Sequence, residues 1–301
     1  MRDNDSIVTD ILEKNIRLLS DVSEKEIKMN PDNSGSLPSI SNLKEIMGII
    51  KVLVFPDFFD RRRNCPTLRP AIISVNIEKL YNILNEEILK AYTFSNDNAK
   101  VRNRATEVTL EFINRLPEIK DVIYTDVEAV FENDPAVHNY GEIILCYPAI
   151  LAILYYRVAH ELLLSGVPVL PRMITELAHS ITGIDINPGA VIGKYFAIDH
   201  GTGVVIGETC IIGNNVTIYQ GVTLGAKNFT LDSSGRPVNI PRHPVIEDNV
   251  TIYSNTTVLG RITIGHDSVI GGNVWLTESV PPQSRVIQPK AKNLCKTKII
   301  K

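Results

Sequence analysis

A histidine between an aspartate and a glycine, Asp199-His200-Gly201, is the part of the sequence best suited to acid–base chemistry. An imidazole titrates near neutral pH, so it can remove the proton of a hydroxyl group while that weak nucleophile attacks. Such a base needs a second group that fixes its tautomer and stabilises the imidazolium. A lone histidine is more often a solvated loop residue, so the neighbouring sequence has to decide between these interpretations.

The residues around His200 belong to a six-residue repeat of aliphatic side chains. Fourteen successive positions hold isoleucine, valine or leucine: Ile186, Ile192, Ile198, Val204, Ile206, Ile212, Ile218, Leu224, Ile246, Ile252, Val258, Ile264, Ile270 and Leu276. A period of six is neither the roughly 3.6 residues of an α-helix nor the two of a strand. It predicts a parallel β-helix in which each hexad forms one flat side and three hexads close a triangular coil.

Glycines recur directly after these aliphatic anchors. They are Gly193, Gly207, Gly213, Gly225, Gly265 and Gly271. We expect them to turn the corners of the coil, because glycine tolerates a positive φ angle.

The repeat is interrupted at two places. Its frame slips by two residues directly after His200, and local rules of a rigid repeat are broken mainly where function requires it. The second interruption is a loop from Lys227 to Pro244, which carries Arg242 and His243. Long excursions from a regular scaffold usually carry function, so both interruptions are candidate sites.

An acidic partner for His200 is available in Asp185, which lies fifteen residues earlier. With about eighteen residues per coil, the two residues fall on adjacent coils near one edge of the β-helix. A contact between them is therefore feasible.

The chain before the repeat, from Met1 to about Ser180, has apolar residues at three- and four-residue spacings, which is typical of amphipathic helices. Pro117 and Pro135 are expected to separate helices, and another helix is expected to begin near Pro171. The segment 29–39 is expected to be a loop or a disordered link.

The predicted fold class is therefore α+β, with an all-helical N-terminal half, a β-helix and one long loop. The expected divisions are a flexible extension over 1–40, a helical domain over 41–180, the β-helix over 181–288 and a C-terminal tail over 289–301.

The composition is that of an ordinary soluble protein in a reducing compartment. A net charge of -3 argues against nucleic acid as the main partner, and four scattered cysteines form neither a disulfide framework nor a metal knuckle. The N-terminus has no secretory pattern. The most apolar window, Ile143–Tyr156, contains Pro148 and is shorter than the about 20 residues of a membrane span, so it is expected to be a buried helix. We expect a cytoplasmic protein that binds no membrane.

Several strings resemble the hexapeptide acyltransferases, and serine acetyltransferase in particular. They are "DPAV" (134–137), "YRVAHEL" (156–162), "GIDINPGAVIG" (183–193), "IDHGTGVVIGET" (198–209), "YQGVTLGA" (219–226) and "RHPVIEDNVTIYSNTTVLG" (242–260). The resemblance runs from about residue 70 to residue 288. It implies a left-handed coil and the transfer of acetyl from acetyl-CoA to the serine hydroxyl, which gives O-acetylserine for cysteine synthesis. Acetyl-CoA is then a co-substrate, and neither a permanently bound cofactor nor a metal is expected.

The resemblance also assigns roles within the predicted site. Asp185 and His200 form the dyad that deprotonates the hydroxyl, which attacks the thioester directly without an acyl-enzyme. Asp199 holds the ammonium of the amino acid and Arg242 forks onto its carboxylate, with His243 beside them. The alternative for Asp199 and Arg242 is a surface ion pair.

One position departs from the family pattern. An acid often follows the DPAV string, whereas this chain has His138 there. Either Asp134 or Glu142 then supplies the negative charge, and we favour Asp134. An equally good interpretation makes Asp134 the N-cap of a helix that begins at Pro135.

Coenzyme A is expected in the groove between neighbouring coils of two subunits, where flat coil backbone can pair with its pantetheine amides. The positions that match this groove are Gly221, Thr223, Gly225, Ala226, Ser254 and Gly272. Each of them also fits a plain turn glycine or a small residue of the coil.

The resemblance implies a homotrimer with sites between subunits, or two such trimers joined through their helical halves. It also implies feedback inhibition by cysteine in the serine pocket. The partner enzyme of the family, O-acetylserine sulfhydrylase, receives a C-terminal isoleucine. This chain ends in "TKIIK", and the charge of Lys301 argues against a tight complex.

Two rival functions remain open. A zinc-dependent lyase on the same kind of coil needs three histidine ligands, and this coil offers His200, His243 and His266 without an HxxxxH pair. A nearer rival acetylates another hydroxyl, of homoserine or a sugar. The pair Asp199 and Arg242 favours an amino acid as the acceptor.

Overall fold

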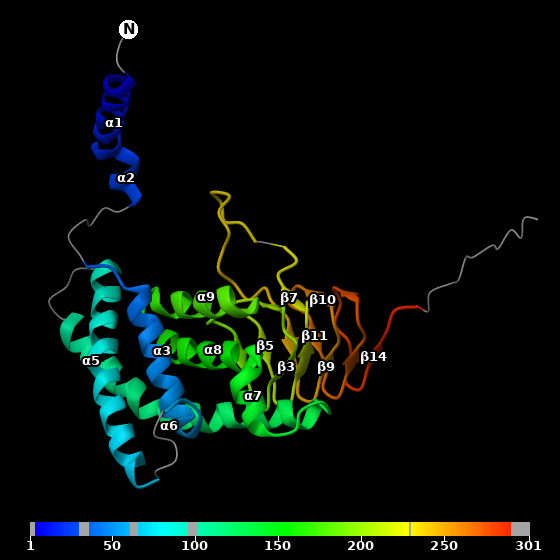
Figure 1. Cartoon of the computed structure of the whole chain (residues 1–301). Helices are drawn as coiled ribbons and strands as arrows, with labels where there is room; N and C mark the ends of the chain where they lie inside the picture. Colours follow the sequence, from blue (N-terminus) through cyan, green and yellow to red (C-terminus); the bar gives the residue numbers. More distant parts are fainter. Residues whose placement is uncertain (1–3, 30–35, 61–65, 96–100, 229, 290–301) are drawn as a thin grey trace, which may run out of the picture. The chain divides into compact units, whose positions relative to one another are not determined.

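The computed structural model describes residues 4–29, 36–60, 66–95, 101–228 and 230–289 (Figure 1). Its contacts divide the chain into two units, one up to Leu37 and one from Pro38 onward, which we treat separately. The expected tail lies outside the described residues from 290 onward, as do residues 30–35 of the expected link.

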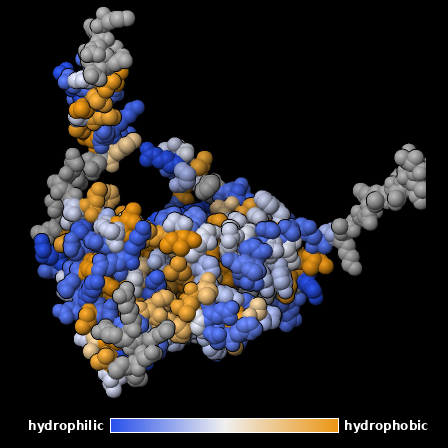
Figure 2. Space-filling model, viewed as in Figure 1, coloured by the Kyte–Doolittle hydropathy of each residue, from blue (hydrophilic) through white to orange (hydrophobic). Residues whose placement is uncertain are grey.

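The first unit contains two helices, within the segment expected to be an extension: α1 (Asn4–Ser20) and α2 (Glu24–Met29). Ser23 and Glu26 form a reciprocal cap at the start of α2, because each side chain accepts the backbone N–H of the other. Apolar side chains of α1 such as Ile11 and Leu12 are exposed. Figure 2 shows hydrophobic surface on this helical segment.

The second unit begins with helices, as predicted. They are α3 (Ile40–Val54), α4 (Pro56–Phe59), η1 (Pro66–Leu68), α5 (Arg69–Ser95), α6 (Val101–Asn133), α7 (Tyr140–Cys146), α8 (Pro148–Leu164) and α9 (Leu170–Thr182). α8 packs against α9 and α6, while α5 packs against α3 and α6. Their buried faces are lined by aliphatic residues and join the core of the β-helix in one continuous hydrophobic cluster.

The predicted helix break at Pro117 is wrong, because Pro117 lies inside α6. A proline removes one backbone hydrogen bond and crowds the carbonyl of the preceding turn. Pro117 is exposed, whereas its neighbours Leu116 and Ile119 are buried. The freed carbonyl can therefore be hydrated on the solvent side while the apolar face continues without a gap. The expected separation at Pro135 is confirmed, since α6 ends at Asn133.

The apolar window Ile143–Tyr156 forms parts of two helices rather than one. α7 ends before Tyr147, and Pro148 opens α8 at a position where a missing N–H costs nothing. Among the described residues, no single helix is long and apolar enough to cross a membrane. α7 and α8 would meet that test only as a pair, which is bent by 72°.

The repeat forms the predicted parallel β-helix with three faces (Figure 1). Face A consists of β1 (Asp185–Ile186), β4 (Val205–Ile206), β7 (Thr223–Gly225), β10 (Thr257–Leu259) and β13 (Trp275–Leu276). Face B consists of β2 (Val191–Ile192), β5 (Ile211–Ile212), β8 (Val245–Ile246) and β11 (Thr263–Ile264). Face C consists of β3 (Ala197–Asp199), β6 (Thr217–Tyr219), β9 (Thr251–Ile252), β12 (Val269–Ile270) and β14 (Arg285–Val286).

The aliphatic anchors stack on their equivalents one coil away, as predicted. On face C, for example, Ile198 pairs with Ile218 and Ile218 with Ile252, and all three are fully buried. Val204 is the exception, because Ile206 and not Val204 is the partner of Ile186. Val204 is a buried corner residue. It lies six positions after Ile198, where an anchor is expected, but the two-residue insertion at this corner moves the anchor to Ile206.

The prediction that the post-anchor glycines turn the corners through positive φ is wrong. Gly193 and its equivalents are not among the glycines with positive φ. A Cβ on Gly193 would lie 2.6 Å from the backbone oxygen of Gly213, so glycine is needed where successive coils touch. Left-handed backbone occurs instead at residues such as Asn215, Asn249 and Asn255, and asparagine tolerates that conformation well.

A buried ion pair joins the helices to the first coil. Asp126 of α6 accepts hydrogen bonds from Nε and Nη2 of Arg157 of α8 at 2.6 and 2.8 Å, and from the backbone N–H of Phe196 at 3.0 Å. Arg157 also donates to the carbonyls of Ile192 and Gly193. The pair therefore satisfies backbone groups at the open end of the β-helix and fixes α6 and α8 against it.

Candidate functional site

The predicted site residues lie along two edges of the β-helix. We call the corner between faces C and A the His200 edge, since His200 follows β3 and precedes β4. We call the corner between faces A and B the Arg242 edge, since Arg242 follows β7 and precedes β8. β4 runs along face A from the first edge to the second.

The two-residue insertion predicted beside His200 is present and shapes its surroundings. Ile198 and Ile206 are successive anchors eight positions apart, whereas Ile218 and Leu224 at the same corner of the next coil are six apart. His200 has φ 57°, so its backbone is left-handed. A Cβ on Gly201 would come within 2.5 Å of Ile184, which explains the glycine. The extra residues thus push the imidazole outward, and 73% of its side chain is exposed in the single chain.

The structure places Asp199 next to His200, with 3.7 Å between Oδ1 and Nδ1. Asp185, the predicted partner, is the first residue of β1, and its backbone N–H donates to Val204 directly after the insertion. Its carboxylate lies 3.6 Å from a guanidinium nitrogen of Arg172. Among the residues that the structure describes, no hydrogen bond or ion pair joins Asp185 to His200. The dyad therefore stays a prediction, with both members at the same edge.

Asp185 also belongs to a group that has ligand atoms for a metal. Glu176, His179 and Asp185 bring such atoms within 4.8 Å of one another. Glu176 and His179 are exposed, and the cationic Arg172 contacts both carboxylates. That positive charge opposes a bound cation.

Asp134 lies close to the same edge and is held as a carboxylate. Its Oδ2 accepts a 2.6 Å hydrogen bond from the Tyr147 hydroxyl and its Oδ1 accepts the Ala136 N–H at 2.8 Å. These two bonds lower the pKa of Asp134, and the charge of His200 acts in the same direction. The same hydrogen bond raises the pKa of Tyr147 to about 12.

The interpretation of Asp134 as a helix N-cap is wrong. The next helix is α7, whose N-cap is Asn139. Glu142 completes that cap, because it accepts the backbone N–H of His138 while its own N–H donates to Asn139. Of the two acids considered to replace the missing one, Glu142 is therefore engaged at the helix start, while Asp134 faces the site.

Asp134 and Asp199 line one small pocket of about 10 Å³ together with Tyr219. The ring of Tyr219 stacks on that of Tyr253 with 4.9 Å between centroids. Burial raises the pKa of Tyr219, and the charge of Asp199 adds to this. The pocket thus combines two carboxylates and a protonated phenol, which suits a cationic group. The sequence interpretation missed Tyr219, although the string "YQGVTLGA" contains it.

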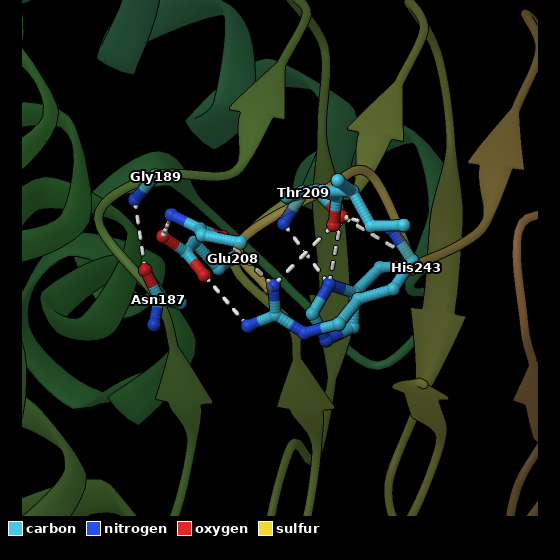
Figure 3. Close-up of polar contacts among 8 residues, drawn as sticks. Asn187, Gly189, Glu208, Thr209 and His243 are labelled. Atoms are coloured by element: carbon cyan, nitrogen blue, oxygen red, sulfur yellow. Dashed lines mark hydrogen bonds and ion pairs between the residues drawn. The ribbon is translucent and has the colours of Figure 1, made fainter. Parts of the chain in front are cut away.

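At the Arg242 edge, Arg242 is anchored by an acid that the sequence interpretation did not single out. Its Nη2 donates to Glu208 at 2.7 Å and its Nη1 donates to Asn239 at 2.9 Å. Glu208 lies within the string "IDHGTGVVIGET", which offered a signal. Figure 3 shows Glu208 beside Thr209 and His243.

His243 is 7% exposed and packs over the backbone of Gly207, where a Cβ would lie 2.0 Å from the ring. Its Nδ1 accepts the backbone N–H of Thr209 at 3.1 Å (Figure 3). Burial lowers the pKa of His243, and the charges of Arg242 and Arg261 lower it further against the opposing effect of Glu208. His243 is therefore a neutral imidazole at neutral pH.

The residues predicted for coenzyme A follow the His200 edge and cross face A. Gly221, with φ +70°, lies one coil after Gly203, and a Cβ on Gly272 would approach Ser254 within 3.2 Å. The remaining residues of this set are Thr223 and Gly225 in β7 and Ala226 directly after it. They form a strip of small residues from one edge to the other.

The structure therefore brings the predicted residues together in two half-sites. Asp134, Asp199 and His200 meet at the His200 edge, while Arg242 and His243 meet at the Arg242 edge. Face A lies between the two groups within one chain.

Comparison with known proteins agrees with this architecture. Residues 243–278 match the family described as bacterial transferase hexapeptide (six repeats). A serine acetyltransferase of Synechococcus elongatus is 45% identical over 266 residues, which cover 85% of this chain and 83% of that protein.

Solved structures are similar over most of the chain. Serine acetyltransferase 1 of Entamoeba histolytica in complex with L-cysteine has a TM-score of 0.72 and 35% identity, covering 84% of this chain and 88% of that one. Soybean serine acetyltransferase complexed with serine has a TM-score of 0.54 and 29% identity, covering 82% and 97%. Serine acetyltransferase of Brucella abortus in complex with coenzyme A has a TM-score of 0.55 and 26% identity, covering 82% and 94%.

The helices followed by a left-handed parallel β-helix, the hexapeptide repeats and a relative of nearly equal extent lead to one assignment. This chain belongs to the serine acetyltransferase family.

Proposed function

We propose that this protein transfers acetyl from acetyl-CoA to the hydroxyl of L-serine and so forms O-acetyl-L-serine for cysteine synthesis. The observation that carries the proposal is the chemistry of the two half-sites. Asp134 and Asp199 suit an ammonium group, while Arg242 and the neutral His243 suit a carboxylate. The relatives solved with serine and with coenzyme A support the two substrates.

The separation of the half-sites supports an assembly in which each site lies between two chains. Serine is too short to reach both edges of face A in one chain, so a second copy must supply the other half-site. In a ring of three copies, the His200 edge of each would lie against the Arg242 edge of the next. We therefore propose a homotrimer, and two such trimers joined through their helical ends would be the larger form.

In the proposed reaction His200 takes the proton from the serine hydroxyl as its oxygen attacks the thioester carbon. The new C–O bond forms, the C–S bond breaks, and the proton passes from His200 to the departing thiolate of coenzyme A. Asp185 stabilises the imidazolium, which requires the exposed ring of His200 to turn toward β1. No acyl-enzyme is required.

Acetyl-CoA would lie along the strip of small residues, with the thioester near His200. The flat backbone there, from Gly221 to Ala226 and around Ser254 and Gly272, can pair with the pantetheine amides as an added strand does. No permanently bound cofactor takes part in this scheme.

Cysteine shares the ammonium and carboxylate of serine, so it would occupy the same pocket and inhibit. The relative solved with L-cysteine supports this proposal.

The test is a thiol-release assay with acetyl-CoA across serine, homoserine and sugars. We expect serine to be the preferred acceptor, and His200→Ala to lower kcat by about 10²–10⁴-fold, the usual contribution of a general base. His266→Ala removes another exposed corner histidine and should leave kcat unchanged. Faster turnover of homoserine or a sugar would contradict the assigned substrate, and full activity of His200→Ala would contradict the base.

A further inference from the structure

Thr209, which follows Glu208 at the Arg242 edge, makes four polar contacts with the end of the long loop. Its Oγ1 accepts the backbone N–H of Arg242 at 2.9 Å and that of His243 at 3.0 Å. The same oxygen lies 2.9 Å from Nδ1 of His243, and the backbone N–H of Thr209 donates to that Nδ1 at 3.1 Å. Figure 3 shows these contacts converging on Thr209.

The hydrogen-bonding capacity of a hydroxyl makes this arrangement unambiguous. A threonine Oγ has two acceptor sites and one proton. Both acceptor sites are used by the two loop N–H groups, so the proton points to Nδ1 of His243. A backbone N–H can only donate, which independently makes Nδ1 an acceptor. The ring proton of the neutral imidazole must then be on Nε2.

We propose that Thr209 is a positioning residue that fixes His243 in the Nε2–H tautomer and holds Arg242 and His243 in register, so that the pair presents donors alone to the carboxylate of the substrate. This deepens the proposed function and rests on it for the identity of the substrate. With the other tautomer, the ring would turn a lone pair toward the carboxylate and repel it. Thr209 therefore acts through His243 and need not touch the substrate.

The charged groups around the ring support the same state. Arg242 and Arg261 both oppose protonation of His243, and Glu208 favours it but is already paired with Arg242. Arg261 also donates to the carbonyls of Thr209 and His243, which holds the two segments together from the other side. A proton on Nδ1 would face the backbone N–H and the hydroxyl of Thr209, which are both donors directed at Nδ1.

The first measurement uses the unmodified protein and needs no substrate. The ring nitrogens of the six histidines are labelled with ¹⁵N, and His243 is assigned from the spectrum of His243→Gln. We expect an unprotonated Nδ1 and a protonated Nε2 for His243 at neutral pH. A protonated Nδ1 would overturn the proposal, whatever the enzyme acetylates.

The second measurement is kinetic and uses three variants. Thr209→Val keeps the shape and removes the hydroxyl, and we expect KM for serine to rise about tenfold with kcat within about twofold, the pattern of lost uniform binding. Thr209→Ser keeps the hydroxyl and should stay within about twofold of the unmodified protein in both. Thr263→Val is the control, because its register partner on face B is already a valine.

Thr209→Val should also move the pH dependence of KM. The hydroxyl donates to the unprotonated Nδ1 and so favours the neutral ring, and its loss therefore raises the pKa of His243. The pH at which KM for serine changes should then be higher than in the unmodified protein. An unchanged KM in Thr209→Val, or a loss of kcat that Thr209→Ser shares, would refute the positioning role. If the unmodified protein does not acetylate serine at all, the proposed function fails, while the tautomer is still decided by the spectrum.

Discussion

At the scale of single residues, Asp134, the acid that we propose for the substrate ammonium, is held by a contact across a break between helices. Tyr147 lies between α7 and α8 only because Pro148 ends the one and begins the other, and its hydroxyl reaches Asp134. The bond keeps the carboxylate ionised and turned in one direction. In the proposed site, Asp134 would supply the negative charge expected at the position of His138, and Tyr147 would orient it.

Tyr147→Phe tests this arrangement. Without the phenol, Asp134 loses a donor to its ionised form, so its pKa rises and the acid limb of the pH profile of kcat/KM for serine moves to higher pH. We expect KM for serine to rise about tenfold, which corresponds to the lower end of the about 1.5–3 kcal/mol that a hydrogen bond to a charged group contributes.

Tyr140→Phe is the matched control for that variant, since the ring of Tyr140 stacks on Phe131 and does not depend on its hydroxyl for this contact. Steady-state kinetics of both variants from acidic to neutral pH decide the matter. Equal profiles for the two variants would show that Tyr147 does not prepare Asp134.

At the scale of elements, the period of six identified the β-helix because an aliphatic side chain from each hexad points into so narrow a coil. The insertion at His200 was visible for the same reason. The sequence did not reveal that Val204 is a corner residue. Val204 lies six residues after Ile198, so it fits the period of six, although Ile206 is the true anchor after the two-residue insertion. Glu208 and Thr209 lie within the string "IDHGTGVVIGET", but their roles could not be assigned from it, since their partners lie beyond a loop whose return path the sequence does not specify.

The glycines after the anchors show a second limit of pattern reading. A glycine can be required for a positive φ or for lack of space, and the sequence does not distinguish the two. At Gly193 the carbonyl of Gly213 in the next coil occupies the space that a side chain would need, and at Gly207 the ring of His243 does so.

Gly193→Ala tests the spatial explanation. Its Cβ would meet backbone atoms of Gly213 that have no freedom to move, so we expect a loss of about 1–3 kcal/mol in the free energy of unfolding. Gly48→Ala in α3 has open space at the same atom and should gain about 0.5–1 kcal/mol from helix propensity. Denaturant unfolding of both variants measures the difference, and a neutral Gly193→Ala would contradict the explanation.

At the scale of the whole molecule, the two half-sites lie on different edges of the β-helix, and the proposed reaction therefore requires more than one copy of the chain. The sequence interpretation placed Asp199, Arg242 and His243 in one serine site, whereas the structure puts Asp199 at the corner between faces C and A and the other two at the corner between faces A and B. The family resemblance implied a trimer, and the separation of the half-sites is the physical argument for the trimer that we propose.

Mixing two inactive variants tests this arrangement. His200→Ala and Arg242→Ala should each be inactive alone. When equal amounts are unfolded together and refolded, random assembly should restore activity at about a quarter of the sites. Half of the sites receive an intact His200, and half of these receive an intact Arg242 from the neighbouring chain. A co-refolded mixture that stays inactive, with each variant assembled normally, would place the whole site within one chain.

The two edges of face A have a genetic consequence as well. In the proposed assembly, a chain with defects at both edges would inactivate the two active sites that it shares with its neighbours, although those neighbours are intact. Such an allele would act dominantly in a cell that also makes the normal protein, whereas an allele damaged at one edge would remain partly complemented.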